Sequence, residues 1–378
     1  MASQSKIKLT YLTFDSLNEG VGASQVLAYL KLLAPDFEIT LVNFEKDTPS
    51  EDQFQQIEEL GIRWSVLPFG STGLLGGFWR IIRMRSRVQS GSLVHARGDL
   101  AAFASILKPR AKVIWDCRAL TADQRRAIAS RKGISLQYLA LRVIESLIAR
   151  RSAAIIVITH AVMPILRRRH NLKSEKFHMV STCVSLQNFT PGNETHEGPF
   201  RVMISGTLGG AYDFESMFNL IDFLKELTPV RVYAALSKGH TDYWKKLPID
   251  EITSVPHSQM PDLVRSMDLG LSVWKMDLGE CLTSVSSTKV PEFLASGVPV
   301  VVNYNQGDIG QLIEEYSCGV SLHDSSEPSL RAAAAQILKL KGDSKTVYRC
   351  RELAEDNFSL DEAVIKLQKI YRSILSVK

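Results

Sequence analysis

The sequence has few cysteines and no motif that pairs them. Its five cysteines are scattered along 378 residues, and no two of them form a C-x-x-C pair. Zinc sites and the disulfide frameworks of secreted domains depend on such spacing, so we expect neither of them here. A reducing cytoplasm is the environment that this cysteine usage predicts.

Long apolar runs are also missing. No uninterrupted apolar stretch reaches the roughly 18 residues that a spanning helix needs. The first residues, Met-Ala-Ser-Gln-Ser-Lys, contain no apolar signal core. The formal net charge is only +5, which is too mild to predict a nucleic-acid partner by itself. We therefore expect a cytoplasmic protein without a spanning helix.

The chain does have the composition of a globular protein, with 45% apolar and 22% charged residues. A length of 378 residues exceeds one typical core and favours two domains. Residues 189–199 concentrate proline, glycine and polar side chains, as linkers do. We predict a first domain over residues 1–190, a linker over 191–199 and a second domain over 200–357.

Strand-like and helix-like patterns alternate in both halves of the chain. Helical apolar periodicity lies between short β-branched runs, which predict strands. The expected strands are residues 7–14, 38–44, 63–67, 93–95, 112–115 and 153–159, then 201–205, 230–235, 251–255, 269–273 and 298–302. Helices between successive strands indicate parallel sheets covered on both faces. The predicted fold class is therefore α/β.

Residues 284–303 have the pattern of a ligand-binding unit: Ser-Val-Ser-Ser-Thr-Lys-Val-Pro-Glu-Phe-Leu-Ala-Ser-Gly-Val-Pro-Val-Val-Val-Asn. A hydroxyl-rich loop with Ser287 and Thr288 leads into a short helix that Gly297 can end in a left-handed cap. Hydroxyl and N–H groups at a helix start suit phosphate, and Glu292 one turn later suits the hydroxyls of a ribose. An ordinary crossover with a solvated glutamate is the alternative, and these residues alone leave both open.

Glycines separate the first strand from the first helix in each half. Gly20 and Gly22 allow close approach of the backbone to a ligand, but a plain tight turn explains them as well. In the second half we expect the turn to cradle a diphosphate with backbone N–H groups, and Lys238 to add a point charge. The residues of that second turn are Gly206, Thr207, Gly209 and Gly210.

Polar side chains lie at the ends of predicted strands, where parallel sheets bind ligands. Asp116 and Arg118 follow one strand, and we interpret them as functional, with an internal ion pair as the alternative. His95 ends another strand, and we interpret it as a hydrogen-bonded structural residue. His257 also follows a strand, and we interpret it as a turn residue.

Basic residues cluster in the first half, with twelve Arg and Lys against two acids between residues 124 and 176. Residues 74–88 predict a basic amphipathic helix with Phe78 and Trp79, typical of helices that lie in an anionic membrane surface. The alternative is a solvated basic face above a stripe that faces the core. Nucleic acid is not expected as a partner, because no recognition-helix, RNA-recognition or zinc-finger signature accompanies these residues.

The motif Ser-Ser-Thr-Lys-Val-Pro-Glu-Phe-Leu-Ala-Ser-Gly-Val-Pro-Val-Val, with the tandem α/β halves and the glycine turn, resembles family 4 of the retaining glycosyltransferases. Residues 154–191 resemble the segment in which that family crosses between domains. Residues 358–378 resemble the helix that crosses back to the first domain. The resemblance implies the GT-B fold, with two Rossmann-like domains facing a central cleft, in an enzyme of the bacterial surface-polysaccharide type.

By this resemblance, Glu292 is the second acid of the family's E-x7-E motif and binds the ribose of the donor. The first acid would fall at Ser284, which departs from the motif, and Glu280 could replace it only in a rearranged loop. The histidine that the family carries after its fifth strand is replaced by Asp-Cys-Arg at residues 116–118. The family's Arg and Lys in the glycine turn are also absent, so Lys238 or Lys289 would supply the charge for the diphosphate.

The implied activity is transfer of a hexosyl or other sugar, with retention and without a metal or cofactor, from a nucleotide-diphosphate sugar. The acceptor would be a glycan or a polyprenyl-diphosphate-linked molecule near Gly20, Gly22, Asp116 and Arg118, with peripheral contact to the inner face of an anionic membrane. One alternative keeps the fold and makes the protein a sugar-nucleotide epimerase, for which acids and histidines are sparse. Another is a catalytically silent scaffold subunit that binds the donor.

Overall fold

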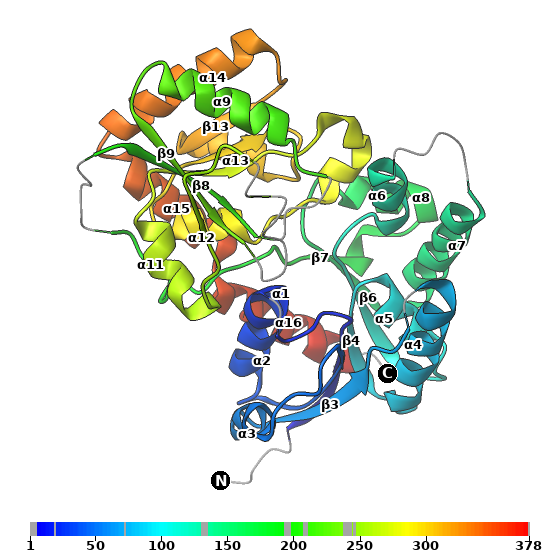
Figure 1. The fold of residues 1–378 in the computed structure, drawn as a ribbon. Coiled ribbons are helices and arrows are strands. Elements are labelled where there is room, and N and C mark those ends of the chain that lie inside the picture. Colours follow the sequence, from blue (N-terminus) through cyan, green and yellow to red (C-terminus); the bar gives the residue numbers. More distant parts are fainter. Residues whose placement is uncertain are drawn as a thin grey trace. The chain divides into compact units, whose positions relative to one another are not determined.

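The chain forms two compact units, each built on one parallel sheet with helices on its faces (Figure 1). The computed structural model describes residues 6–18, 20–71, 73–129, 135–192, 198–206, 211–236, 244 and 247–376. The first unit is Met1–Val180 with Asp361–Lys378, and the second is Ser181–Leu360. None of the described helices is both long and apolar enough to cross a bilayer.

The first unit contains seven parallel strands in the order β3-β2-β1-β4-β5-β6-β7. The strands are Ile7–Leu12 (β1), Phe37–Glu45 (β2), Ile62–Pro68 (β3), Leu93–Arg97 (β4), Lys112–Cys117 (β5), Ala154–Val157 (β6) and Phe177–Met179 (β7). Its helices are Gly20–Gly22 (α1), the π-helical Ala23–Leu27 (η1), Ala28–Leu33 (α2), Glu51–Glu59 (α3), Gly73–Arg87 (α4), Asp99–Ile106 (α5), Thr121–Ile128 (α6), Leu136–Arg151 (α7), Met163–His170 (α8), the 3-10 turn Ser174–Lys176 (η2) and Leu360–Ser376 (α16). Strands β4 and β5 run two residues further than predicted, so Arg97 and Asp116 are strand residues.

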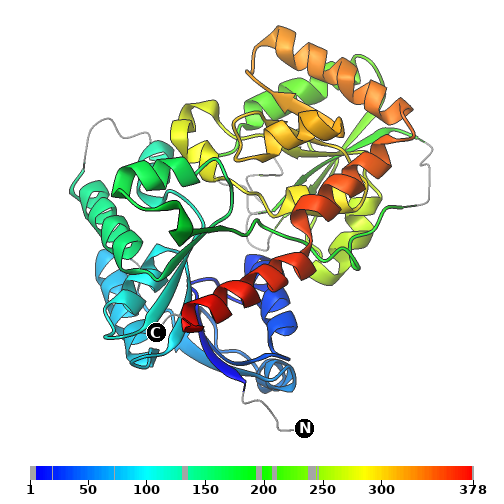
Figure 2. The same ribbon diagram turned by 180° about the vertical axis from the view of Figure 1, so that it is seen from behind.

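The C-terminal helix α16 packs against the sheet of the first unit, where Figure 2 shows it in red beside the blue strands. Its Tyr371 is fully buried and meets the ring of Phe37 edge-on, with centroids 5.4 Å apart. The Tyr371 hydroxyl lies 2.7 Å from Nδ1 of His95 in β4. The last helix of the chain therefore completes the core of the first unit.

The second unit contains six parallel strands in the order β10-β9-β8-β11-β12-β13. They are Phe200–Ser205 (β8), Val230–Ala235 (β9), Glu251–Thr253 (β10), Leu269–Ser272 (β11), Val300–Asn303 (β12) and Gly319–Leu322 (β13). Its helices are Phe214–Lys225 (α9), His257–Gln259 (η3), Met260–Arg265 (α11), Met276–Ser284 (η4), Lys289–Ala295 (α12), Ile309–Tyr316 (α13), Glu327–Gly342 (α14) and Thr346–Phe358 (α15). The division from the first unit falls before residue 190, because Val184 and Phe189 pack into the core of the second unit.

Both sheets reverse their strand order between the first strand of the unit and the strand beside it. This switch lies between β1 and β4 in the first unit and between β8 and β11 in the second. In open α/β sheets, ligands bind beyond the carboxyl ends of the strands at such a switch. Arg97 ends β4, Gly206 directly follows β8, and Trp274 follows β11. These residues mark the carboxyl edge of each sheet, where each unit by itself is expected to bind a ligand.

Gly22 is required by close packing against the loop that follows β1. A methyl group at Gly22 would lie 1.9 Å from the carbonyl oxygen of Ser16. The loop is fixed, because Glu45 accepts a hydrogen bond of 2.7 Å from the backbone N–H of Leu17 and another from the Ser16 hydroxyl. This packing accounts for the glycine without a ligand.

Replacing Gly22 with alanine is therefore expected to lower the free energy of unfolding by about 1–3 kcal/mol, as overpacking does. Urea unfolding of the full chain measures this change. Gly20→Ala is the matched control, because no atom lies within 4 Å of a methyl group there. Equal effects of the two substitutions would contradict the packing explanation.

Candidate functional site

Lys289, at the start of α12, crosses the carboxyl end of β8 in the second unit. A methyl group built at Gly206, whose φ is +100°, would lie 1.9 Å from Cε and 2.3 Å from Nζ of Lys289. The lysine thus occupies space that only a glycine leaves open. Its ammonium donates a hydrogen bond of 3.0 Å to the Tyr212 hydroxyl. No carboxylate in the described part of the chain pairs with Lys289, so its charge remains available to an anion.

Tyr212 can hold that ammonium in place because aromatic packing fixes its ring. The ring is buried and its centroid lies 4.5 Å from that of Trp274, with which Tyr212 also forms an antiparallel bridge. Asn303, the last residue of β12, accepts a hydrogen bond of 2.6 Å from the Trp274 N–H and donates one of 2.8 Å to its carbonyl. Residues at the carboxyl ends of β8, β11 and β12 therefore position the ammonium of Lys289.

Glu292 lies one turn further along α12 and is a buried carboxylate with unfilled acceptors. It is only 7% exposed and accepts no hydrogen bond from the residues that the structure describes. His257 Nε2 faces it, 3.5 Å from Oε1, but this buried nitrogen forms no hydrogen bond with any residue that the structure describes. Buried polar groups are normally satisfied, so this pair marks a place where the donors of a ligand fit.

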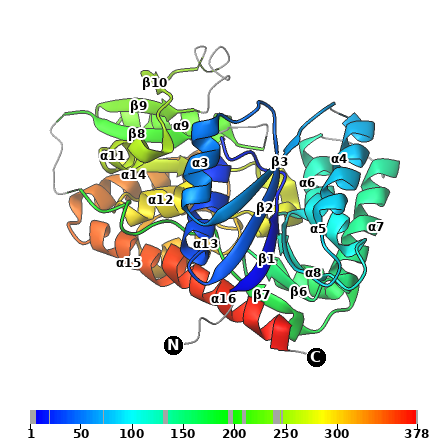
Figure 3. The ribbon, with the colours of Figure 1, turned by 90° about the horizontal axis from the view of Figure 1, so that it is seen from below.

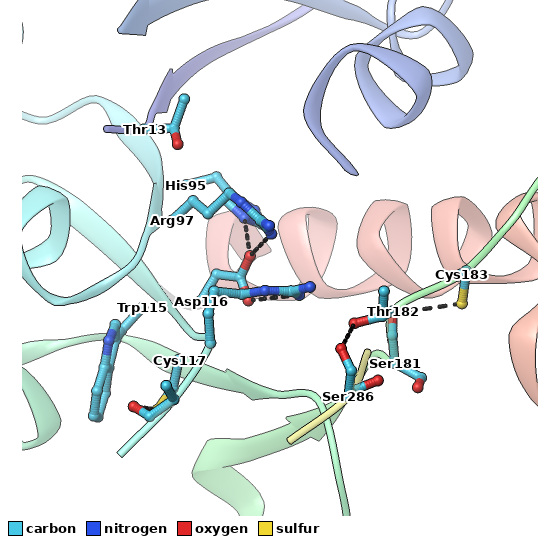
Figure 4. Close-up of polar contacts among 12 residues, drawn as sticks. Thr13, His95, Arg97, Trp115, Asp116, Cys117, Ser181, Thr182, Cys183 and Ser286 are labelled. Carbon is cyan, nitrogen blue, oxygen red and sulfur yellow. Dashed lines mark hydrogen bonds and ion pairs between the residues drawn. The ribbon is translucent and has the colours of Figure 1, made fainter. Parts of the chain in front are cut away.

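Hydroxyl groups beside Lys289 and Gly206 are also unsatisfied. The Oγ atoms of Ser287 and Ser205 are buried and have no hydrogen-bond partner among the described residues. Thr288 precedes α12, and its side chain does not cap the helix. Thr182 donates a hydrogen bond of 3.2 Å to the Ser286 carbonyl and so holds the loop before α12 (Figure 4). The second unit thus brings Gly206, Ser287, Thr288, Lys289 and Glu292 together at the ends of β8 and β11.

Ser284, where the resemblance places the first acid of E-x7-E, is buried at the end of η4. Its hydroxyl donates a hydrogen bond of 2.9 Å to the Cys281 carbonyl within the same turn. Glu280 is exposed on η4. The predicted residues Lys238, Thr207, Gly209 and Gly210 lie outside the described residues.

In the first unit, buried charges gather at the ends of β4 and β5 (Figure 4). Asp116 lies 3.4 Å from His95 Nε2, 3.5 Å from Arg97 Nη1 and 3.4 Å from Arg118 Nη1. Burial alone would raise the pKa of Asp116, but Arg118, His95 and Arg97 together hold it well below its usual value. A general base needs a pKa near the working pH, so Asp116 is not poised as one.

Arg97 links this cluster to the loop after β1. Its Nε donates a hydrogen bond of 2.6 Å to Oδ2 of Asp15. Burial disfavours the guanidinium charge, yet Asp15, Tyr11 and Asp116 raise the pKa of Arg97 above its ordinary value. The interpretation of His95 as a buried, hydrogen-bonded residue is confirmed.

The internal ion pair that the sequence left open for Asp116 and Arg118 is present, while contact of either residue with a substrate stays a prediction. Sequence reasoning missed Tyr212 and Asp15 as site residues. For Asp15 there was a signal, because its carboxylate lies in the polar loop that directly follows the first strand. For Tyr212 there was none, because no local pattern indicates that its hydroxyl binds a lysine.

Replacing Asp116 with asparagine is expected to lower the free energy of unfolding by about 3–5 kcal/mol near neutral pH, because Arg97 and Arg118 then lose a buried counter-charge. The folded pKa of Asp116 is depressed, so its contribution exists above its unfolded pKa of 3.8 and disappears as the pH falls below that value. The variant and the wild type should therefore converge in acid. Urea unfolding at several pH values measures this, with the exposed Asp47→Asn as control; a pH-independent difference would contradict it.

No protein-family model matches the sequence, and no curated protein matches it. Solved structures do match in fold. They include sucrose-phosphate synthase from Thermosynechococcus elongatus, with a TM-score of 0.73 and 12% identity over 99% of this chain and 100% of that chain. A glycosyltransferase from Rickettsia africae matches with a TM-score of 0.69 and 12% identity over 99% of this chain and 100% of the other.

Anabaena HepE in complex with UDP and glucose is a third match, with a TM-score of 0.69 and 15% identity over 97% of this chain and 100% of that chain. The structural neighbours include glycosyltransferases of the GT-B fold, and the two parallel sheets of this chain match that fold. The predicted fold class is thus confirmed. At these identities the likeness establishes the fold alone.

Proposed function

We propose that this protein is a glycosyltransferase that takes its sugar from a nucleotide-diphosphate sugar bound in the second unit. The observation that carries the proposal is the buried, unsatisfied carboxylate of Glu292 one turn from the ammonium of Lys289 over Gly206. The vicinal hydroxyls of a ribose offer the donors that the carboxylate lacks, and a diphosphate offers the charge that the ammonium lacks. The Anabaena complex with UDP and glucose supports a donor of this class.

In the proposed reaction, the bond between the anomeric carbon and the diphosphate oxygen breaks as the acceptor oxygen bonds to that carbon. Negative charge develops on the leaving diphosphate, where Lys289 and backbone N–H groups near Gly206 stabilise it. The acceptor proton passes to the leaving phosphate, so no side chain has to act as base. Retention, a hexosyl sugar, independence from a metal and membership of family 4 are parts of this proposal that rest on the resemblance.

The proposed acceptor is a glycan or a polyprenyl-diphosphate-linked molecule, as in surface-polysaccharide synthesis, and Gly20, Gly22 and Arg118 of the first unit are its proposed contacts. A polyprenyl chain lies in a membrane, so the proposal includes peripheral contact with an anionic membrane surface. The ammonium of Lys289, which no described carboxylate neutralises, also needs an anion in the second candidate function, a scaffold subunit that binds the donor without turnover. The buried Ser284 in place of the family's first acid favours that candidate.

Incubation with UDP-, GDP- and CDP-sugars separates these functions. A ligand that prefers the folded state raises the melting temperature, and released nucleoside diphosphate reports slow hydrolysis of the donor. The transferase predicts that one donor both stabilises the protein and is hydrolysed. Stabilisation without any turnover, even with acceptor lipids present, would favour the scaffold. If no nucleotide or donor stabilised the protein, both functions would be wrong.

A further inference from the structure

The helix α4 exposes an apolar stripe to solvent. Leu75 is 77% exposed and Trp79 57%, and Phe78 and Ile82 are exposed beside them. These positions are i, i+3, i+4 and i+7, so their side chains form one continuous line along the helix. The helix buries Met84 instead, and the alternative in which this stripe faces the core is therefore wrong.

The helix α7 carries a second exposed stripe. Leu136 is 86% exposed, and Leu139, Val143 and Leu147 continue the exposed line at three- and four-residue spacings. Both α4 and α7 pack against α5 and lie side by side at the edge of the first unit (Figures 1 and 3). We call the exposed apolar residues of α4 and α7 the docking face. Monomeric proteins rarely leave two such apolar stripes uncovered on neighbouring helices, so the stripes indicate a partner.

The exposed charges that α4 and α7 themselves carry have one sign. At 3.6 residues per turn, Arg83 and Arg85 project roughly 70–90° to either side of the α4 stripe, and both are exposed. Arg150 and Arg151 are exposed at the end of α7. Helix α4 has no acidic residue, and the single acid of α7, Glu145, is buried with its Oε1 2.7 Å from His170 Nε2.

No arginine of α4 pairs with a carboxylate in the residues that the structure describes. Three of them donate to backbone carbonyls instead: Arg80 to Ser71 at 2.7 Å, Arg83 to Pro68 at 3.5 Å and Arg85 to Leu107 at 3.4 Å. A carbonyl does not neutralise a guanidinium group, so Arg83 and Arg85 keep their positive charge beside the stripe.

We propose that the docking face binds the surface of an anionic bilayer. The apolar residues would enter the boundary between head groups and acyl chains, where tryptophan is favoured, and the arginines would meet lipid phosphates. An anionic bilayer offers an apolar layer for the stripes and only the sign of charge that these arginines need. This inference rests on the peripheral membrane contact proposed above and identifies the surface that makes it.

Vesicle flotation with the purified full chain tests the proposal without donor or acceptor. Wild-type protein should float with phosphatidylglycerol-containing vesicles at low salt and not with pure phosphatidylcholine. Phe78→Ser with Trp79→Ser should reduce partitioning at least about tenfold, and Leu139→Ser with Val143→Ser should do the same. Arg83→Gln with Arg85→Gln should reduce it about 10–30-fold at low salt and much less at high salt.

Tyr348→Ser is the matched control, because Tyr348 is 76% exposed on α15 of the second unit. It should float like the wild type, and unchanged melting temperatures would show that all variants are folded. Trp79 also reports insertion: brominated lipids should quench wild-type fluorescence clearly more than that of Trp79→Phe, which still binds.

Absence of flotation with anionic vesicles, or flotation of both serine double variants at the wild-type level, would overturn the proposal. The proposal would also be overturned if light scattering showed that the wild type is a dimer and that Phe78→Ser with Trp79→Ser dissociates it, because the docking face would then join two copies. Neither result would show whether the second unit binds a nucleotide, since stabilisation by nucleotide is measured without lipid. Conversely, a failure to bind nucleotide would not change how the protein binds vesicles.

Discussion

Replacing Glu292 with alanine is expected to weaken binding of the nucleotide sugar by about 10²–10⁴-fold, because each hydrogen bond to a charged group contributes roughly 1.5–3 kcal/mol. The free protein should keep or slightly gain stability, since the substitution removes a buried carboxylate that has no hydrogen bond among the described residues. This opposite effect on binding and stability is typical of residues kept for function. Isothermal titration and thermal unfolding of the same preparations measure both quantities.

Glu315→Ala is the matched control, because Glu315 is an exposed acid of the same unit. It should bind donor like the wild type. If Glu292→Ala lost stability in proportion to its loss of binding, the carboxylate would be a structural residue and the proposed role would be wrong.

Replacing Lys289 with methionine is expected to lower the rate of donor cleavage by about 10²–10³-fold, the loss seen when one preorganised charge or donor is removed from a developing anion. Methionine keeps most of the length that fills the space over Gly206, so the fold should be retained. Single-turnover release of nucleoside diphosphate measures the rate apart from binding. Tyr212→Phe keeps the packing on Trp274 and removes only the hydroxyl, so a smaller loss of about three- to tenfold is expected.

Lys345→Met is the control for charge, because Lys345 is exposed near α15 and distant in sequence from α12. It should cleave donor at the wild-type rate. If Lys289→Met lowered affinity for the donor but left the single-turnover rate unchanged, the ammonium would bind ground state and transition state equally. The catalytic role proposed for it would then be wrong.

Local pattern was enough to predict most strands and the helices between them, because β-branched runs and 3.6-residue periodicity are properties of short segments. The short helix that contains Glu292 was predicted in this way, and so was its end at Gly297, which has the expected left-handed conformation with a φ of +75°. Helix α6 was missed, since Thr121–Ile128 is largely polar and has little apolar periodicity. The ends of β4 and β5 were placed too early, because the polar residues Arg97 and Asp116 lie inside them.

Contacts between distant segments could not be predicted from the sequence. Tyr371 reaches His95 across 276 residues, and His257 faces Glu292 because α11, which follows η3, packs against α12. The apolar stripe of α4 illustrates a different limit. Periodicity locates an apolar stripe, but a stripe that faces the core and one that faces a lipid surface have the same spacing, so only the burial of Met84 and the exposure of Trp79 decide between them.

The proposed donor site depends above all on the binding of a nucleotide ribose by Glu292. The most direct test is a cycle of four affinities, measured by isothermal titration on the wild type and Glu292→Ala. The ligands are the nucleoside diphosphate among UDP, GDP and CDP that stabilises the protein most, and its 2′,3′-dideoxy analogue. We expect the wild type to prefer the hydroxylated nucleotide by about 100-fold or more and the variant to bind both alike. Equal binding of the two ligands by the wild type, or a preference that survives in the variant, would contradict it.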